Sequence, residues 1–190
     1  MLFNTPNLVT FSRIVLIPLF IGLYYLPDEW LSDHGKNVTA TVVFILAAFT
    51  DWLDGYLARK LNQMSAFGAF LDPVADKLIV AGALIALLHL NRVDMIVALI
   101  IIGREVAISA LREWMAKVGQ AKSVAVATIG KLKTTGQMIA IPLLLYHDTL
   151  FGVLDCQWLG TVLINIAAVL TVLSMLYYLR KALPHASVRL

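Results

Sequence analysis

Residues 51–77 read DWLDGYLARKLNQMSAFGAFLDPVADK, and they place four aspartates beside long apolar runs: Asp51, Asp54, Asp72 and Asp76. An ionised carboxylate in or near hydrocarbon costs several kcal/mol, so acids in such a position indicate a functional site. Four carboxylates within residues 51–76 repel one another and cannot all stay ionised unless cations lie between them. The segment therefore predicts a cation site.

The composition is typical of a membrane protein. Of the 190 residues, 60% are hydrophobic and only 14% are charged, and the mean hydropathy is +0.83. A soluble domain of this size is about half apolar and a quarter charged, so we expect an all-α, polytopic membrane protein. The continuous apolar runs exclude a transmembrane barrel, whose residues alternate. The single cysteine, Cys156, excludes a disulfide within the chain and a cysteine-based metal site.

Six transmembrane helices are expected, each with the length of about 20 residues that crosses the hydrocarbon of a bilayer. The turns between them are short and polar, and no internal repeat or separate soluble domain is visible. We therefore expect residues 1–190 to form a single membrane domain. The expected spans cover residues 7–26, 38–60, 69–90, 93–116, 124–147 and 156–180. Pro73 is interpreted as a residue at the start of the third span.

The basic residues predict the orientation of these spans. With the N-terminus in the cytoplasm, the outer loops hold only Lys36 and Arg92, and the other 13 of the 15 Lys and Arg residues lie inside. Both termini and all four aspartates are then cytoplasmic. The isoelectric point near 9.1 reflects this asymmetry, and without a basic patch interleaved with aromatics it does not indicate binding to nucleic acid.

The spacing of the aspartates predicts a metal site. Asp51 and Asp54 are three residues apart, Asp72 and Asp76 are four apart, and each pair lies on one face of its helix. The two helices are consecutive, so their cytoplasmic ends can bring the four carboxylates together. Hard oxygen ligands suit two Mg²⁺ or Mn²⁺ ions, which can clamp the attacking and leaving oxygens of a displacement at phosphorus.

The residues between the aspartates resemble a known signature. Small residues (Gly55, Ala58 and Gly68) allow a ligand to approach, and Arg59 can bind a phosphate oxygen, although helix packing also explains small residues. The pattern Asp51-x2-Asp54-Gly55-x2-Ala58-Arg59-x8-Gly68-x3-Asp72-x3-Asp76 is similar to that of the CDP-alcohol phosphatidyltransferase family. The resemblance implies that Asp51, Asp54, Asp72 and Asp76 bind metal, that Asp76 is also the general base, and that Gly55, Ala58, Arg59 and Gly68 bind the CDP group.

The residues expected to bind the acceptor are basic. Arg104, Arg112 and Lys131 interrupt the fourth and fifth spans and predict a pocket for the phosphate of a phosphorylated alcohol. An ion pair of Arg104 with Glu105 or with another helix is the alternative interpretation. Lys133, like Lys117 and Lys122, is interpreted as snorkelling to the anionic leaflet.

Several other segments resemble bacterial members of the family that use CDP-diacylglycerol and glycerol 3-phosphate. They are NLVTFSR, GAFLDPVADK, GRE…ALREW and GKLKTT. This resemblance implies the bacterial inner membrane as location, transfer of the phosphatidyl group to glycerol 3-phosphate with release of CMP, and Asn7 and Thr10 near the CDP group. For Asn7, a helix cap is the alternative.

Three other functions stay open at this point. The acceptor of the same reaction could be another alcohol, such as inositol phosphate. A cation-coupled transporter would also use acids, but such sites usually lie at the bilayer midplane between repeats. A scaffolding membrane protein would leave the clustered aspartates unexplained. A homodimer is compatible with the small residues of the spans, which allow close helix contacts.

Overall fold

The computed structural model describes residues 5–61, 66–119 and 128–183, without the side chains of residues 5–9, 51–61, 66, 67, 69 and 128–131. Six α-helices run through the described residues, with one short 3-10 turn, η1, at Leu23–Tyr25. The helices are α1 (Thr5–Gly22), α2 (Asp33–Leu61), α3 (Ala66–His89), α4 (Met95–Lys117), α5 (Thr128–Tyr146) and α6 (Cys156–Ala182). The all-α prediction is confirmed, and each expected span overlaps one helix, with residues 124–127 of the fifth span outside the described residues.

Two details of the helices differ from expectation. Pro73 lies inside α3 and not at its start, because α3 already begins at Ala66. Proline has no N–H, so the carbonyl of residue 69 loses its helical partner at this point.

The other difference is a two-stranded hairpin between α5 and α6. Its strands β1 (Thr149–Leu150) and β2 (Leu154–Asp155) are antiparallel, with Leu150 opposite Leu154.

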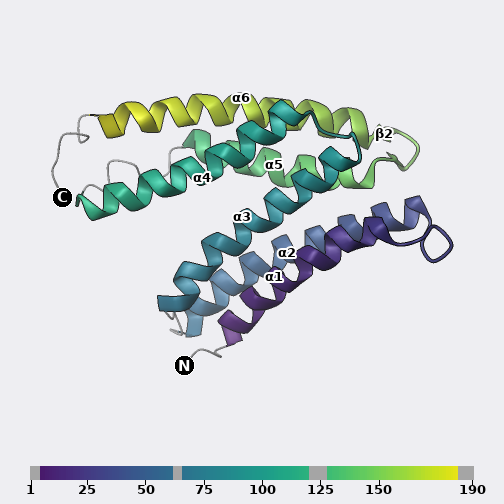
Figure 1. Ribbon diagram of the computed structural model, residues 1–190, viewed down its shortest axis with the longest axis horizontal. Helices are drawn as coiled ribbons and strands as arrows, with labels where there is room; N and C mark the ends of the chain where they lie inside the picture. Colours follow the sequence, from purple (N-terminus) through teal and green to yellow (C-terminus); the bar gives the residue numbers. More distant parts are fainter. Residues whose placement is uncertain (1–4, 62–65, 120–127, 184–190) are drawn as a thin grey trace.

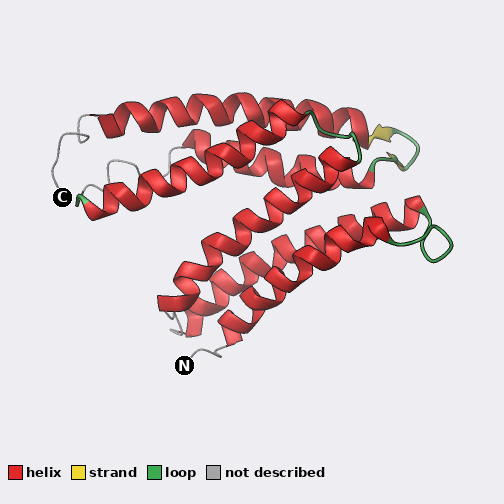
Figure 2. Ribbon diagram, viewed as in Figure 1, coloured by secondary structure: helices red, strands yellow, loops and turns green. Residues whose placement is uncertain are grey.

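The helices form two groups of three. Figure 1 shows α1, α2 and α3 together in purple to teal, with α4, α5 and α6 above them, and Figure 2 shows how little of the chain is not helical. Successive helices run in opposite directions. We call the end where α1, α3 and α5 begin the N-terminal end of the bundle. The ribbons of the two groups diverge toward this end and approach each other at the opposite end.

The packing explains this arrangement. One core joins both groups and contains fully buried leucine and isoleucine side chains, among them Leu84, Leu87, Ile101 and Leu144. Buried alanines such as Ala40 lie in the same core, where small side chains let helices approach closely. Toward the N-terminal end a second, smaller core belongs to α4 and α6 alone and consists of Ile108, Met115, Tyr178 and Ala182.

The outer surface is apolar along much of the bundle. Ile85, Leu99, Val106 and Leu173 are all more than half exposed, which is typical of a surface that another apolar phase covers. By length and composition, α6 is the one helix of the described residues that can cross a membrane, and Thr10–Tyr25 forms a shorter apolar stretch. Six membrane spans therefore remain a prediction.

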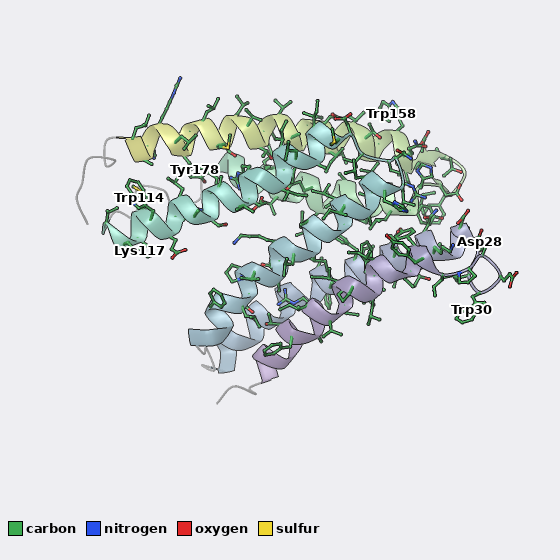
Figure 3. The ribbon with its side chains drawn as sticks, in the orientation of Figure 1. Asp28, Trp30, Trp114, Lys117, Trp158 and Tyr178 are labelled. Atoms are coloured by element: carbon green, nitrogen blue, oxygen red, sulfur yellow. The ribbon has the colours of Figure 1, made fainter. Side chains whose placement is uncertain are left out.

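Polar contacts close the opposite end of the bundle. Arg92, between α3 and α4, donates hydrogen bonds to Asn37 Oδ1 at 2.9 Å and to the carbonyl oxygens of Leu144 at 3.2 Å and Leu145 at 2.8 Å. It thereby satisfies carbonyls of the last turn of α5, which have no partner within the helix. Asp94 and Asp155 cap the first turns of α4 and α6. Figure 3 shows Asp28, Trp30 and Trp158 at this end, and Trp114 and Lys117 at the other.

Candidate active site

The aspartate segment spans the end of α2 and the beginning of α3. Figure 1 shows these two helix ends side by side at the N-terminal end of the bundle. Asp51 and Asp54 belong to α2, but their side chains lie outside the described residues. Asp72 and Asp76 belong to α3, and both side chains are partly exposed. The structure thus describes half of the expected cluster.

Helix α1 binds both described aspartates. The Thr10 hydroxyl donates a hydrogen bond of 2.6 Å to Asp72 Oδ1, and the Arg13 guanidinium donates one of 2.8 Å to Asp76 Oδ1. Thr10 and Arg13 are one turn apart on α1, as the aspartates are on α3, so the contacts form two successive rungs. Arg13 is only 2% exposed, whereas the Asp76 side chain is 42% exposed. A buried guanidinium such as that of Arg13 needs a partner of opposite charge. The two contacts from α1 therefore orient the carboxylates of Asp72 and Asp76.

The residues expected to bind the CDP group are only partly described. Gly55, Ala58 and Arg59 lie on the last turns of α2, and their side chains, like that of Asn7, are outside the described residues. Gly68 is buried near the beginning of α3. Thr10 is buried and contacts Asp72, which places it at the aspartates. These assignments stay predictions.

A cavity of about 270 Å³ adjoins Asp76 on the side away from α1. Its size approaches the lower end of ordinary small-molecule sites, about 300 Å³. Three helices line it: α3 with Pro73, Asp76, Lys77 and Val80, α4 with Glu105, and α5 with Thr134, Gln137 and Met138. The space lies between α3 of the first group and α4 and α5 of the second. A polar molecule bound here would contact Asp76 directly.

Glu105 connects this cavity to buried cations. Its carboxylate forms an ion pair with Lys133, whose side chain is completely buried, and a longer contact of 3.4 Å with Arg104. Arg104 also donates a hydrogen bond of 3.2 Å to the Ser174 hydroxyl on α6. The interpretation of Lys133 as a snorkelling residue is wrong, because a completely buried ammonium group paired with Glu105 does not reach a lipid surface.

Two of the predicted phosphate-binding residues, Arg104 and Arg112, lie beside an aromatic ring. The guanidinium groups of Arg104 and Arg112 lie 5.9 Å and 5.4 Å from the centre of the Tyr178 ring. Figure 3 shows Tyr178 between α6 and α4. Both arginines therefore lie at the contact of α4 with α6, and Arg104 approaches the cavity through Glu105. The side chain of Lys131 lies outside the described residues. That these three residues bind phosphate stays a prediction.

Sequence reasoning missed Gln137 and two ion pairs of this site, Arg13–Asp76 and Glu105–Lys133. The Arg13–Asp76 contact was not expected, although the matching one-turn spacings of Thr10–Arg13 and Asp72–Asp76 could have indicated it. Glu105 and Lys133 could have been paired, because a carboxylate and an ammonium group in neighbouring apolar spans each need a partner. Gln137 carries no charge and interrupts an apolar run only briefly, so the sequence holds no clear signal for it.

The chemistry of the described donors fits a divalent cation. Asp72 and Asp76 lie one turn apart and present carboxylate oxygens, which Mg²⁺ and Mn²⁺ prefer to nitrogen or sulfur ligands. Among the side chains that the structure describes, no three or more acidic, histidine or cysteine residues form a cluster. Asp51 and Asp54 are not among them, so the complete ligand set is not described.

Known proteins resemble the chain over almost its entire length. Curated relatives include the CDP-diacylglycerol–glycerol-3-phosphate 3-phosphatidyltransferases of Escherichia coli (strain K12), Salmonella typhimurium and Shigella flexneri. Each is 46% identical over 184 residues, which cover 96% of this chain and 96% of the relative. No solved structure matches. The model of the family described as CDP-alcohol phosphatidyltransferase matches residues 3–175. The chain belongs to the CDP-alcohol phosphatidyltransferase family.

Proposed function

We propose that the protein transfers the phosphatidyl group of CDP-diacylglycerol to glycerol 3-phosphate, giving phosphatidylglycerophosphate and CMP. The observation that carries this proposal is the 46% identity, over 96% of both chains, to enzymes named for this reaction. The site agrees with it, because a carboxylate, Asp76, lines a cavity of the size of a small polar acceptor.

The reaction forms one bond and breaks one. The primary hydroxyl of glycerol 3-phosphate attacks the lipid-bearing phosphorus, the bond from that phosphorus to the bridging oxygen of CMP breaks, and CMP leaves with the electron pair. Asp76 accepts the proton of the attacking hydroxyl. Its contact with Arg13 holds the carboxylate in position, and a base must be held within hydrogen-bond reach of the proton it removes.

Two divalent ions, Mg²⁺ or Mn²⁺, would be held by Asp51, Asp54, Asp72 and Asp76. When bound, they neutralise the pyrophosphate and stabilise the charge that develops in an in-line displacement. Thr10 holds Asp72 through its hydroxyl, which leaves the carboxylate oriented by α1 before any ligand arrives. The CDP group would contact Gly55, Ala58, Arg59 and Gly68, with Asn7 and Thr10 close by.

The phosphate of the acceptor would be bound by Arg104, Arg112 and Lys131. The support is that Lys77 lines the cavity and that Glu105, which also lines it, pairs with Arg104 and Lys133. Cations close to the cavity favour an anionic acceptor over a neutral one. An acceptor such as inositol phosphate would meet the same charges, so the acceptor has to be identified by experiment.

The protein would lie in the bacterial inner membrane as one domain with six spans. The apolar outer surface and the asymmetry of the Lys and Arg residues support this location, with both termini and the aspartates on the cytoplasmic side. CDP-diacylglycerol would then reach the site from the cytoplasmic leaflet with its acyl chains in lipid. A homodimer is compatible with the small residues of the spans.

The test is CMP release by the purified protein in detergent or in vesicles that contain CDP-diacylglycerol. We expect release that depends on both glycerol 3-phosphate and Mg²⁺ or Mn²⁺ and stops on chelation. A panel with inositol phosphate, serine and glycerol identifies the acceptor. Release with inositol phosphate but not with glycerol 3-phosphate would contradict the proposed acceptor, and no release with any acceptor would contradict the reaction.

A further inference from the structure

Gln137 has an unsatisfied polar group at the cavity beside Asp76. The residue is 3% exposed and lines that cavity, and its amide nitrogen Nε2 has no hydrogen-bond partner among the described residues. Burying an amide donor without a partner destabilises a fold, so most buried donors in proteins are paired. A polar ligand in the cavity would supply the missing partner.

The position of Gln137 relates it to both ends of an acceptor molecule. Asp76 faces the same cavity from α3, and Lys133 precedes Gln137 by one turn on the same face of α5. Gln137 therefore shares this cavity with the proposed base, and Glu105, which also lines it, connects the cavity to the cations Lys133 and Arg104.

The other polar groups of the cavity are less suited to a neutral hydroxyl. Glu105 is engaged in its ion pair with Lys133, and Lys77 carries only donors. Thr134 is engaged in interactions of its own. The Gln137 amide has both a donor and an acceptor, which matches a hydroxyl group, since a hydroxyl also donates and accepts.

We propose that Gln137 is a specificity-determining residue that hydrogen-bonds the secondary hydroxyl of a three-carbon acceptor phosphate. The inference rests on the proposed function and deepens it, because it assigns a residue to the part of the acceptor between the reacting hydroxyl and the phosphate. Gln137 takes no part in the proton transfer, so its contribution is to discriminate between acceptors that differ at this one hydroxyl.

The test compares two acceptors in the same protein preparation. Glycerol 3-phosphate has the secondary hydroxyl, and 3-hydroxypropyl phosphate lacks it but keeps the reacting hydroxyl and the phosphate. For the wild type we expect kcat/KM to be about tenfold higher with glycerol 3-phosphate, the effect of one hydrogen bond. For Gln137→Met we expect this ratio to fall to about one, with kcat/KM for 3-hydroxypropyl phosphate unchanged. The ratio does not depend on the fraction of folded protein.

Gln157→Met is the matched control, because Gln157 is exposed at the beginning of α6, at the opposite end of the bundle, and should keep the wild-type ratio. An unchanged ratio in Gln137→Met, or an equal loss with both acceptors, would overturn the inference and leave the proposed function intact. A wild type that releases no CMP with either acceptor would overturn both. Thermal unfolding without acceptor should show Gln137→Met to be at least as stable as the wild type, since methionine removes the unsatisfied amide.

Discussion

The two ends of the helix bundle use charged residues in different ways. At the opposite end, Arg92 binds backbone carbonyls of α5 and the Asn37 amide, and Asp94 and Asp155 cap helices. At the N-terminal end, Asp76 and Glu105 are paired with cations and also line a cavity. The first set completes hydrogen bonds that helix ends lack. The second set presents carboxylates to a space that a ligand can enter.

A hydrogen-bond partner alone therefore does not identify a functional acid. Asp155 and Asp76 both accept a good hydrogen bond, of 2.9 Å and 2.8 Å. What distinguishes Asp76 is the wall of three helices around the space that it faces.

Asp76→Asn should reduce CMP release by about 10²–10⁴-fold, the usual contribution of a general base, because the amide cannot accept the proton of the acceptor hydroxyl. The measurement is kcat with glycerol 3-phosphate. Asp155→Asn is the control at the opposite end, and it should keep full activity because asparagine also caps helices well. Wild-type turnover by Asp76→Asn would remove the proposed base.

Glu105→Gln should destabilise the fold by about 3 kcal/mol or more, because the completely buried Lys133 then lacks its partner. Thermal or denaturant unfolding in detergent measures this. Combining it with Lys133→Met should restore part of the stability, since no buried charge then remains unpaired. The control is Lys117→Met, which removes an exposed pair with Glu113 and should change stability by less than about 0.5 kcal/mol. Equal effects of Glu105→Gln and Lys117→Met on stability would contradict the conclusion that Lys133 is buried and needs Glu105 as its partner.

Arg92→Met should destabilise the fold by about 1–3 kcal/mol, because carbonyls at the end of α5 and the Asn37 side chain lose their donor. The kcat of the folded fraction should stay at the wild-type value, since Arg92 lies far from the aspartates. Arg180→Met, at an exposed position on α6, should leave both quantities unchanged. A drop in kcat without a loss of stability in Arg92→Met would show that the two ends are coupled.

Asp28→Asn should have the smallest effect of these changes on the melting temperature. The effect should be present at neutral pH and disappear at alkaline pH. The hydrogen bond to Asp28 raises the pKa of Lys36 above its usual value, so its contribution to stability is present at neutral pH and is lost as the pH rises through that raised pKa. The melting temperature of the variant should therefore lie below that of the wild type at neutral pH, and the two should converge as the pH rises through the pKa of Lys36. A constant difference at all pH values would contradict this assignment.

Much of the fold could be predicted from the sequence. Six apolar runs of the right length, separated by short polar turns, indicated the six helices to within a few residues at most of their ends. The deviations arise where local chemistry competes with a simple pattern. Pro73 was read as a helix start, but α3 extends further back and accommodates the proline within it. The hairpin of residues 149–155 has strands of two residues, which are too short to give a period.

The site could be predicted only in part. The spacing of Asp72 and Asp76 indicated a shared face of one helix, because residues one turn apart always lie on the same face. The contacts of these aspartates with Thr10 and Arg13 could not be predicted, because they depend on how α1 packs against α3. The surroundings of Arg104 also depend on packing: the chain places it next to Glu105, but only the position of α6 brings it to Tyr178 and Ser174.

By itself, the sequence determined the helical class and, through the spacing in residues 51–76, membership of a family of phosphatidyltransferases. Hydrophobic periodicity and helical spacing are local properties, so they can be read along the chain. Only the tertiary structure decided which charges pair and which residues share the cavity beside Asp76. Glu105 and Gln137 come from different helices. Which of their side chains is buried, and what each contacts, depends on how the helices pack, and no local sequence pattern encodes that packing.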